Sequence, residues 1–437
     1  MDDPEFVYRA NVVRLDPSPA EAVVLRDVAR RVSAFWNVAN YECRQRFFKG
    51  ERVPSCTKLW NLTKAHSTYK ALPSDVAQEV LKKLSESWKS HFELRRKWKR
   101  GEIPDKPGLP RYRKDRKTKE YREDFIPIKT DRSYAVESRT VTVTLPRDLR
   151  GGDVASGDRI APSYRGLRRY TGKKGRAEIS FDAGRGRWYF RWSVKSEAQP
   201  NRTWTRAAGI DLGVRVLASV SVEGEAVATH FSGRETLKDW DYWGRQIARH
   251  QRELAHRKRR SSKRLRRLHR KRRQRLVHAW EALAAQVASE MKRKKVGVVY
   301  IGHPKNIRRD RRYQGPWNGR IHNFWGFALS SRILKKHLNR ARIQVLLVDE
   351  RGTSSRCPGC PSSEVTRRPR HWLRCRECGL EIHSDQAGSR NMISKYRPDT
   401  SWDGLEASPR TEAHIWNQHR WVDSENQRSA HALPRAA

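Results

Sequence analysis

The chain has 437 residues, which is long enough to bury a sizeable core in about two to four domains. It carries 94 Lys and Arg residues against 48 Asp and Glu residues, and the net charge of +46 indicates a polyanionic partner such as nucleic acid. A membrane partner is not expected, because no apolar run reaches the roughly 20 residues of a membrane-spanning helix. The N-terminus is acidic and has no apolar signal core, so we expect a cytoplasmic protein.

The first 122 residues combine one strand with helices. Residues 7–14 alternate as a β-strand, and Ser18 is placed to cap a helix over residues 20–48. A second helical pattern covers about residues 73–99, and the stretch 101–120 that follows is a basic loop rich in Pro and Gly.

Strand patterns then return over residues 124–146 and 177–195. In the second of these stretches, two apolar segments flank the Gly-containing loop at residues 182–186, which is typical of a β-hairpin. Together with the strand at residues 7–14, these segments predict a small β-barrel that is interrupted by a helical insertion.

The character changes after residue 205. Strand and helix patterns alternate in the order 217–222, 236–294, 296–301, 322–340 and 343–348. Such alternation predicts an α/β sheet. Residues 397–437 are polar with little periodicity, and we expect a polar tail that is partly disordered or contacts RNA.

Four cysteines form two close pairs. Cys357 and Cys360 make one Cys-x-x-Cys pair, and Cys375 and Cys378 make the second after a gap of 14 residues. Four thiolates in two such pairs can enclose one tetrahedral zinc ion, so we expect a structural zinc ribbon. Two redox-active dithiols are the alternative, but the usual thioredoxin context is missing.

Two acidic residues stand in positions that suit metal chemistry. Asp211 ends a strand just before Gly213, and Asp385 follows Cys378 by seven residues, where a zinc module would hold it rigidly. Carboxylates at strand ends can hold two Mg²⁺ ions that activate water and steady the leaving oxygen of a phosphodiester. Asp211 alone could be an ordinary turn residue, but its combination with Asp385 favours a metal-dependent nuclease.

The order of these motifs resembles a known family. Gly-Ile-Asp-Leu-Gly at residues 209–213, a basic helical stretch, Thr353-Ser354, the two cysteine pairs and Asp385 follow one another as in TnpB. TnpB is the RNA-guided nuclease of bacterial transposons from which the type V CRISPR effectors arose. The last motif of that family has its counterpart here at residues 385–392, from Asp385 to Met392.

The resemblance implies a multidomain α/β and β architecture. It comprises an N-terminal wedge β-barrel with a helical recognition insertion and an RNase H-like (RuvC) nuclease domain with an inserted zinc ribbon. The implied boundaries are 1–17 for the first wedge strand, 18–122 for the helical recognition lobe, 123–205 for the wedge barrel, 206–355 for the nuclease domain with a basic hairpin at 236–295, 356–383 for the zinc ribbon, 384–396 for the last nuclease segment and 397–437 for the polar tail.

One position departs from the family pattern. The family normally has a catalytic Glu at the end of the middle strand, where this chain has Gly302. The next strand ends in Asp349 and Glu350, and a carboxylate from that strand could reach the same metal ions. Glu350 is longer, and Gly302 would leave it space. We therefore expect Asp211, Glu350 and Asp385 to be the catalytic Mg²⁺ ligands, with Asp349, or no third carboxylate, as the alternatives.

Basic residues between the expected helices point to nucleic acid. We expect phosphate contacts, which carry little sequence information, from Arg257, Lys258, Arg259, Arg260, Lys263, Arg264, Arg267 and Lys271. Arg111 and Arg113, in the basic loop before the barrel strands, are expected to act in the same way. Arg116 and Lys117 belong to the same loop. Leu265 and Leu268 should pack the basic helix against its neighbour.

The resemblance and the residues together predict an RNA-guided DNA endonuclease, specifically a small type V CRISPR effector close to TnpB. We expect two catalytic Mg²⁺ ions, one structural Zn²⁺, a guide RNA, a double-stranded DNA target beside a short flanking motif, and a monomer or dimer in the bacterial cytoplasm. A transposon-encoded TnpB nuclease, a nuclease-dead RNA-guided repressor and a DNA-binding transposase that works without RNA are the alternatives.

Overall fold

The computed structural model describes residues 6–115, 118–129, 133–152, 157–197, 203–303, 320, 324, 326–360, 362–367, 371–400, 402 and 409–424. The chain forms two compact units, residues 1–198 and 199–437. Arg116 and Lys117 lie outside the described residues. Among the helices of the described part, none has the length and apolar character that crossing a membrane requires.

The first unit is built on two long helices, α1 (Pro19–Phe48) and α4 (Ser74–Lys99), with α2 (Cys56–Thr63) and α3 (Ser67–Lys70) between them. Helix α1 begins where the sequence predicts. The Ser18 hydroxyl accepts a hydrogen bond from the Glu21 amide at 3.2 Å, and the Glu21 carboxylate accepts one from the Ser18 amide at 2.7 Å. This reciprocal capping box satisfies two amides that the helix itself cannot pair.

The strands of the first unit form two sheets. The larger has the order β2-β7-β8-β1-β6, and the smaller has the order β3-β4-β5. Their strands are β1 (Phe6–Asp16), β2 (Phe125–Ile128), β3 (Tyr134–Val136), β4 (Val141–Thr144), β5 (Arg159–Ile160), β6 (Ser163–Arg165), β7 (Lys173–Asp182) and β8 (Arg187–Glu197), with the 3₁₀ turn η1 (Arg147–Leu149) after β4. The predicted hairpin is β7 paired with β8.

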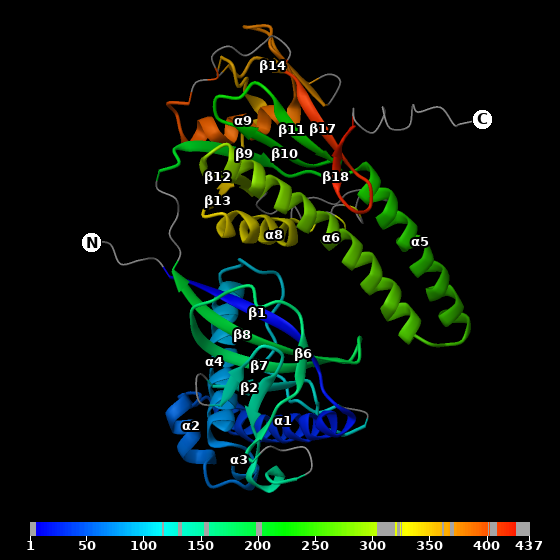
Figure 1. Ribbon diagram of the computed structural model, residues 1–437. Helices are drawn as coiled ribbons and strands as arrows, with labels where there is room; N and C mark the ends of the chain where they lie inside the picture. The colour runs from blue at the N-terminus through cyan, green and yellow to red at the C-terminus, as the bar shows by residue number, and fades with distance from the viewer. Residues whose placement is uncertain are drawn as a thin grey trace, which may run out of the picture. The chain divides into compact units, whose positions relative to one another are not determined.

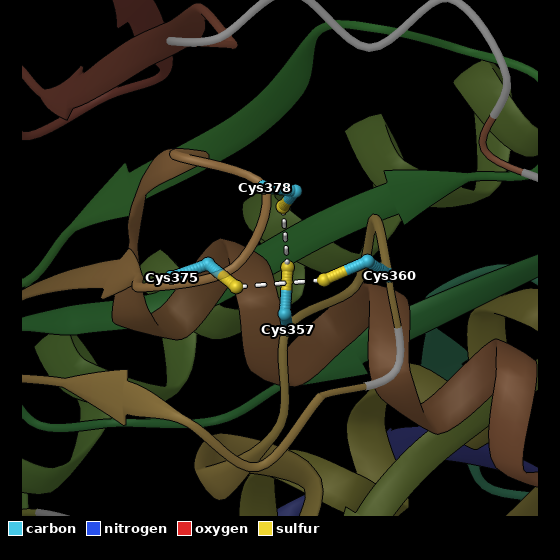
Figure 2. Close-up of side chains that lie close together, drawn as sticks. All are labelled: Cys357, Cys360, Cys375 and Cys378. Carbon is cyan, nitrogen blue, oxygen red and sulfur yellow. Dashed lines mark hydrogen bonds between the residues drawn. The ribbon is translucent and has the colours of Figure 1, made fainter.

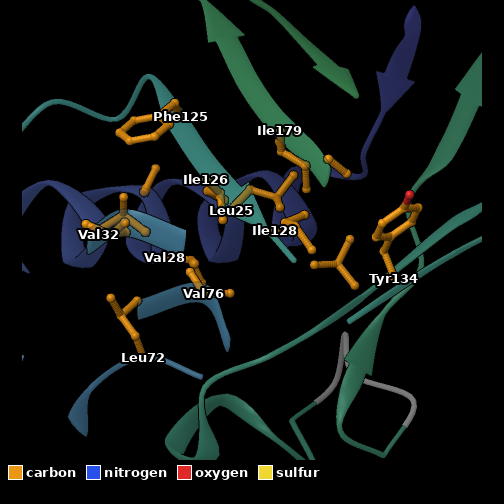
Figure 3. Close-up of a cluster of buried hydrophobic side chains, with 14 of the residues drawn as sticks. Leu25, Val28, Val32, Leu72, Val76, Phe125, Ile126, Ile128, Tyr134 and Ile179 are labelled. Atoms are coloured by element: carbon orange, nitrogen blue, oxygen red, sulfur yellow. The ribbon is translucent and has the colours of Figure 1, made fainter. Parts of the chain in front are cut away.

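The core of the first unit joins its helices to its sheets. Figure 3 shows Leu25 and Val28 of α1 beside Val76 of α4, with Ile126 and Ile179 of the sheet packed over them. All five side chains are buried. Removal of this apolar surface from water is what holds the inserted helices to the strands.

The second unit contains a seven-stranded sheet of order β13-β12-β9-β10-β11-β17-β18. Strands β9 (Arg206–Asp211), β10 (Val216–Val222) and β11 (Ala228–Ser232) form an antiparallel meander, and β12 (Val296–His303) and β13 (Gln344–Asp349) run parallel to β9 on its other side. Helices α6 (Lys263–Arg293) and α8 (Phe327–Arg340) cover one face, whereas α9 (Ser384–Tyr396) packs against β9, β10 and β12. Figure 1 also shows α5 (Arg234–His256) alongside α6 as a long hairpin.

A small module separates β13 from α9 in the sequence. It consists of the 3₁₀ turn η3 (Thr353–Ser355) and a three-stranded sheet of β14 (Val365–Thr366), β15 (Trp372–Cys375) and β16 (Glu381–His383). We call residues 357–383 the four-cysteine module.

The prediction for residues 397–437 is wrong for part of this segment. Strand β17 (Thr411–Trp416) pairs parallel with β11, and β18 (Trp421–Asp423) pairs antiparallel with β17. Trp416 and Trp421 are buried, and the Trp421 indole N–H donates to the Ala279 carbonyl of α6 at 2.9 Å. The local sequence pattern does not reveal these strands, because two tryptophans supply most of their burial and because the pairing partner, β11, lies about 180 residues earlier in the chain.

Replacing Trp421 with Ala should therefore destabilise the second unit by about 3–5 kcal/mol, because the change leaves a cavity and removes the indole hydrogen bond to the Ala279 carbonyl. Hydrogen exchange followed by mass spectrometry should show faster exchange in α6 and β11. The matched control is Trp372→Ala, since Trp372 is 45% exposed. Equal protection in both variants would show that the hairpin does not belong to the cooperative core.

Candidate functional site

The four predicted zinc ligands converge on one point. Figure 2 shows the sulfurs of Cys357, Cys360, Cys375 and Cys378 facing one another. All four Sγ atoms lie within 4.8 Å of one another, with 3.5 Å between Cys357 and Cys378 and 3.4 Å between Cys360 and Cys375. Sulfurs around a tetrahedral zinc with bonds of about 2.3 Å stand about 3.8 Å apart, so the donor set and its spacing fit zinc.

The surroundings of the cluster shift the pKa values of its thiols in opposite directions, since burial raises those of Cys357 and Cys360 whereas that of Cys375 is lowered. The Gly359 amide donates to the Cys357 sulfur at 3.4 Å. Burial alone would raise the pKa of the Cys375 thiol, but the backbone amides of Cys378 and Glu377 outweigh it and lower that pKa to about 7. A thiol that ionises readily is prepared for metal binding.

Replacing Cys375 with Ser should remove bound zinc, because three sulfurs leave the tetrahedral site open. Metal analysis of the purified chain should fall from about one equivalent of zinc to well below half, and hydrogen exchange across the four-cysteine module should accelerate. Cys56→Ser is the control, since Cys56 lies outside the cluster in the first unit. Unchanged zinc in the Cys375 variant would contradict the site.

The predicted carboxylates lie on the face of the sheet that α9 covers. Asp211 ends β9, Glu350 directly follows β13, and Asp385 lies in the first turn of α9. Alternation along β9 places Ala208 and Ile210 in the core beneath α6 and α8, so Ala207, Gly209 and Asp211 face the opposite side. The three side chains therefore come from three separate elements that meet at one edge of the sheet.

Two glycines allow α9 to approach β9 closely. A Cβ atom on Gly209 would stand 1.9 Å from the Ser389 carbonyl oxygen, and one on Gly388 would stand 2.7 Å from the Asp211 carboxylate. Either side chain would force the helix away from the strand. The Ser389 hydroxyl, 2.7 Å from the Ser221 hydroxyl, ties the same turn of the helix to β10. Asp211 thus lies directly against the helix that carries Asp385.

Glu350 occupies the space above Gly302. A Cβ atom on Gly302 would stand 2.7 Å from Glu350 Oε2 and 2.9 Å from Met392 Sδ. In the parallel pairing of β12 with β13, Gly302 stands opposite Val348, and Glu350 lies two residues further on the same face. Asp349 belongs to the opposite face, and its carboxylate accepts a hydrogen bond from the Arg351 amide at 3.1 Å. This geometry favours Glu350 over Asp349 as the third carboxylate.

The loop that carries Glu350 is fastened to α9. The Asn391 side-chain amide donates to the Thr353 carbonyl at 2.7 Å and to the Arg356 carbonyl at 2.8 Å. Lys395 donates to the carbonyls of Asp349 and Arg351 at 3.0 and 2.9 Å. These bonds fix the backbone on both sides of Glu350 to the helix that holds Asp385. The sequence placed Asn391 in the last family motif but did not show this role.

His383 joins the four-cysteine module to the carboxylates. It ends β16, and its Nδ1 accepts a hydrogen bond from the Asp385 amide at 3.2 Å, which caps the start of α9. Its ring contacts His230 of β11, with 4.8 Å between ring centroids. Burial and the neighbouring His383 lower the pKa of His230 to about 3, so His230 is neutral at physiological pH.

The electrostatics of the site resist three negative charges. Burial raises the pKa of Asp211 well above its usual value, and the charges of Asp385 and Glu350 raise it further. Arg367 of the four-cysteine module acts in the opposite direction. Burial, followed by the charge of Asp349, raises the pKa of Glu350 to about 7. Oxygen ligands that repel one another in this way fit hard divalent cations such as Mg²⁺, which would neutralise them.

In the described part of the chain, the four cysteines are the one group of His, Cys, Asp or Glu side chains placed to share a single metal ion.

The predicted nucleic-acid contacts fall into two groups. The eight cations of the α5–α6 turn and early α6 are exposed, and none forms an ion pair with a described residue. Leu265 and Leu268 pack against α5 as predicted. Arg111 is also exposed. Arg113, in contrast, pairs with Asp124 and lies 3.8 Å from the centre of the Phe125 ring, which gives it a structural role within the first unit.

Two family models and a curated relative match this chain. Residues 191–308 match a family described as probable transposase, and residues 327–392 match the Cas12f1-like TNB domain. The TnpB-like protein ORF457 of Acidianus two-tailed virus is 29% identical over 420 residues, which are 89% of this chain and 86% of that protein.

A solved structure has a similar fold. One chain of a Cas12f1–sgRNA–target DNA complex matches with a TM-score of 0.57 at 13% identity, covering 89% of this chain and 98% of that one. The predicted resemblance is therefore confirmed, and the chain is related to TnpB and the compact type V effectors.

Glu350 makes the folded protein sensitive to pH in the absence of divalent ions. Its pKa is about 7 in the folded chain and about 4.3 in an unfolded one. Between these two pH values the folded state binds more protons than the unfolded state. The free energy of unfolding therefore falls as pH rises from about 4 to 7, and it stays lower above pH 7. Glu350→Gln should remove that loss and raise stability by about 1–3 kcal/mol at pH 8 but not at pH 4.

Thermal melts in EDTA at both pH values would measure the effect, with exposed Glu364→Gln as the control. Mg²⁺ should stabilise the wild type more than the Glu350 variant. A Glu350 variant that is equally or less stable at pH 8 would contradict the buried, charge-repelled carboxylate.

Proposed function

We propose that this chain is an RNA-guided DNA endonuclease that cuts at a single carboxylate site formed by Asp211, Glu350 and Asp385. The observation that carries the proposal is the placement of the Glu350 carboxylate over Gly302, where the family motif has its own catalytic Glu. The chain therefore has a third carboxylate in the place where the linear motif has lost one.

The sheet order supports an RNase H-like (RuvC) core. An antiparallel meander, β9 to β11, with two parallel strands added beside its first strand, is the arrangement expected of that fold. The sheets of the first unit would then be the wedge barrel, and α1 to α4 the recognition lobe. Residues 356–383 would be the zinc ribbon of the target nucleic-acid-binding module.

The carboxylates would hold two Mg²⁺ ions, which when bound supply an activated water and neutralise the charge of the scissile phosphate. Asp211, whose pKa is raised by the charges of both Asp385 and Glu350, would be one of their ligands. The hydrogen bonds from Asn391 and Lys395 keep the Glu350 backbone in position. The glycine contact of α9 with β9 keeps Asp385 in position.

The exposed cations support guide RNA and DNA as partners. Eight exposed positive charges from Arg257 to Lys271 on one hairpin would bind phosphates without reading sequence. The similar Cas12f1 chain was solved with an sgRNA and target DNA, which supports the same pair of partners here. A short duplex motif beside the target would be read by the protein and the rest by base pairing.

Two biological settings are compatible with this activity. The Cas12f1-like match at residues 327–392 favours a small type V CRISPR effector, which we propose, whereas the TnpB-like relative favours a transposon-encoded nuclease. The RNA that copurifies after expression with flanking genomic DNA separates them. Varied repeat-flanked spacers on a fixed scaffold would indicate CRISPR, and one RNA from the end of the element would indicate a transposon.

Cleavage by the RNA-bound protein should depend on all three carboxylates. Asp211→Ala, Glu350→Gln and Asp385→Ala should each slow cutting of a matched duplex by roughly 10³-fold or more, while target binding changes little. Asp349→Asn is the matched control, since that side chain faces away, and it should cut at near the wild-type rate.

Two outcomes would overturn parts of this proposal. Full activity of Glu350→Gln with loss in Asp349→Asn would move the third ligand to Asp349. A wild-type complex that binds its target but does not cut it in Mg²⁺ would favour the RNA-guided repressor. Site-specific activity that survives RNase treatment would favour a transposase that works without RNA.

A further inference from the structure

A cavity of about 710 Å³ lies beside the candidate active site in the second unit. Its walls come from the loop that follows Glu350, the first cysteine pair, the last turns of α9 and Trp402. Pockets of this size can enclose a small ligand or one unit of a polymer, but not a duplex. None of the predicted nucleic-acid contacts lies in it.

The charged residues of this cavity are all positive. Arg351 and Arg356 come from the loop, and Lys395 comes from α9; all three side chains are exposed. No carboxylate of the described residues lines the cavity, and none lies within ion-pairing distance of these three cations. Because the Lys395 ammonium already donates to the Asp349 and Arg351 carbonyls, the two arginines are the cations best suited to an anion such as a phosphate.

One wall of the cavity is an indole held in a fixed orientation. The Trp402 N–H donates to the Ser394 hydroxyl at 3.0 Å, and the Arg390 guanidinium lies 4.9 Å from the centre of the ring. Trp402 is only 8% exposed and packs with Met392 and Ile393 of α9. A rigid aromatic wall next to cations is the combination that binds a nucleotide, with the base on the ring and the phosphate on the charges.

The cavity lies within reach of the strand that enters the active site. Arg351 directly follows Glu350. Along α9, Asn391 and Lys395 stand about 9 and 15 Å from Asp385, a span that corresponds to a few nucleotides of single strand. The same Asn391 that pins the Glu350 loop lines this cavity, so the cavity and the carboxylates share one rigid support.

We propose that this cavity captures one unstacked nucleotide of the single-stranded DNA that runs to the carboxylates, with its phosphate at Arg351 and Arg356 and its base against Trp402. The inference rests on the proposed function and adds a binding site to it. Its role is to hold the strand so that the scissile phosphate reaches Asp211, Glu350 and Asp385. Only a base that has left its duplex can enter, which favours single strands over duplex DNA.

The test uses binding rather than cutting. In the full-length chain with Glu350→Gln, a short oligothymidylate containing 5-iododeoxyuridine is bound, irradiated and mapped by mass spectrometry. The expected crosslinks lie at Trp402 or on the last turns of α9. Crosslinks confined to other parts of the chain would overturn the proposal.

Variants in the same background separate the two halves of the nucleotide. Arg351→Ala with Arg356→Ala should weaken binding of oligothymidylate, and of an abasic strand of the same length, at least fivefold. Trp402→Phe should weaken oligothymidylate binding and leave the abasic strand unchanged, since only the base meets the ring. Lys335→Ala, an exposed cation on α8, is the control for charge.

The outcomes distinguish this site from the nuclease itself. If the paired Arg variant binds both strands as tightly as the control does, the cavity is not a nucleotide site, whatever the wild type cuts. If the crosslinks map to Trp402 but the wild-type protein never cuts DNA, the nucleotide-binding proposal is supported and the proposed nuclease activity is rejected. A melt of each variant shows whether it is folded, and the crosslinking test needs no substitution in the cavity.

Discussion

The backbone contact between α9 and β9 is the constraint on which the candidate active site depends. Gly209 and the Ser389 carbonyl leave no room for a side chain, and Gly388 lies against the Asp211 carboxylate. Because a helix cannot come so close to a strand across ordinary side chains, these glycines decide where the first turn of α9 lies. That turn carries Asp385, so the distance between the first and last motifs of the chain is set by the absence of two Cβ atoms.

The four-cysteine module acts on the same geometry from the other side. It begins seven residues after Glu350 and ends just before Asp385, so both carboxylates flank it in sequence. Within it, His383 caps α9, and at its entry Asn391 and Lys395 clamp the loop to the helix. A zinc ion that orders the module would therefore also order two of the three carboxylates, although it lies outside the chemistry.

Negative and positive side chains gather in different places, the carboxylates at the candidate active site and the cations on exposed surfaces. The chain is strongly positive overall, yet burial and the charges of Asp385 and Glu350 together raise the pKa of Asp211 and oppose its ionisation. Such a site is unfavourable until cations enter it, and this cost is the reason that metal ions and a polyanionic substrate would be bound there together. The exposed cations of the α5–α6 hairpin and of the cavity near Trp402 differ from this site, because phosphate groups alone can neutralise them and no metal ion is required.

The sequence by itself determined the parts that depend on local spacing. The two Cys-x-x-Cys pairs predicted the cluster of four sulfurs, Ser18 predicted the start of α1, and the motifs around Asp211 and Asp385 marked these two carboxylates as candidates. Alternation along β13 also separated Glu350 from Asp349, since side chains two residues apart share a face.

Only the tertiary structure decided what depends on partners distant in the chain. It showed Glu350 above Gly302, and it placed Arg113 in an ion pair with Asp124. It also turned part of the expected tail into β17 and β18 at the edge of the sheet. Local sequence pattern does not determine these features. A strand at a sheet edge, the space above a glycine and an ion pair each depend on a second residue whose position only the fold sets. The same holds for the cavity at Trp402, whose walls lie up to about 50 residues apart in the chain and meet only in the fold.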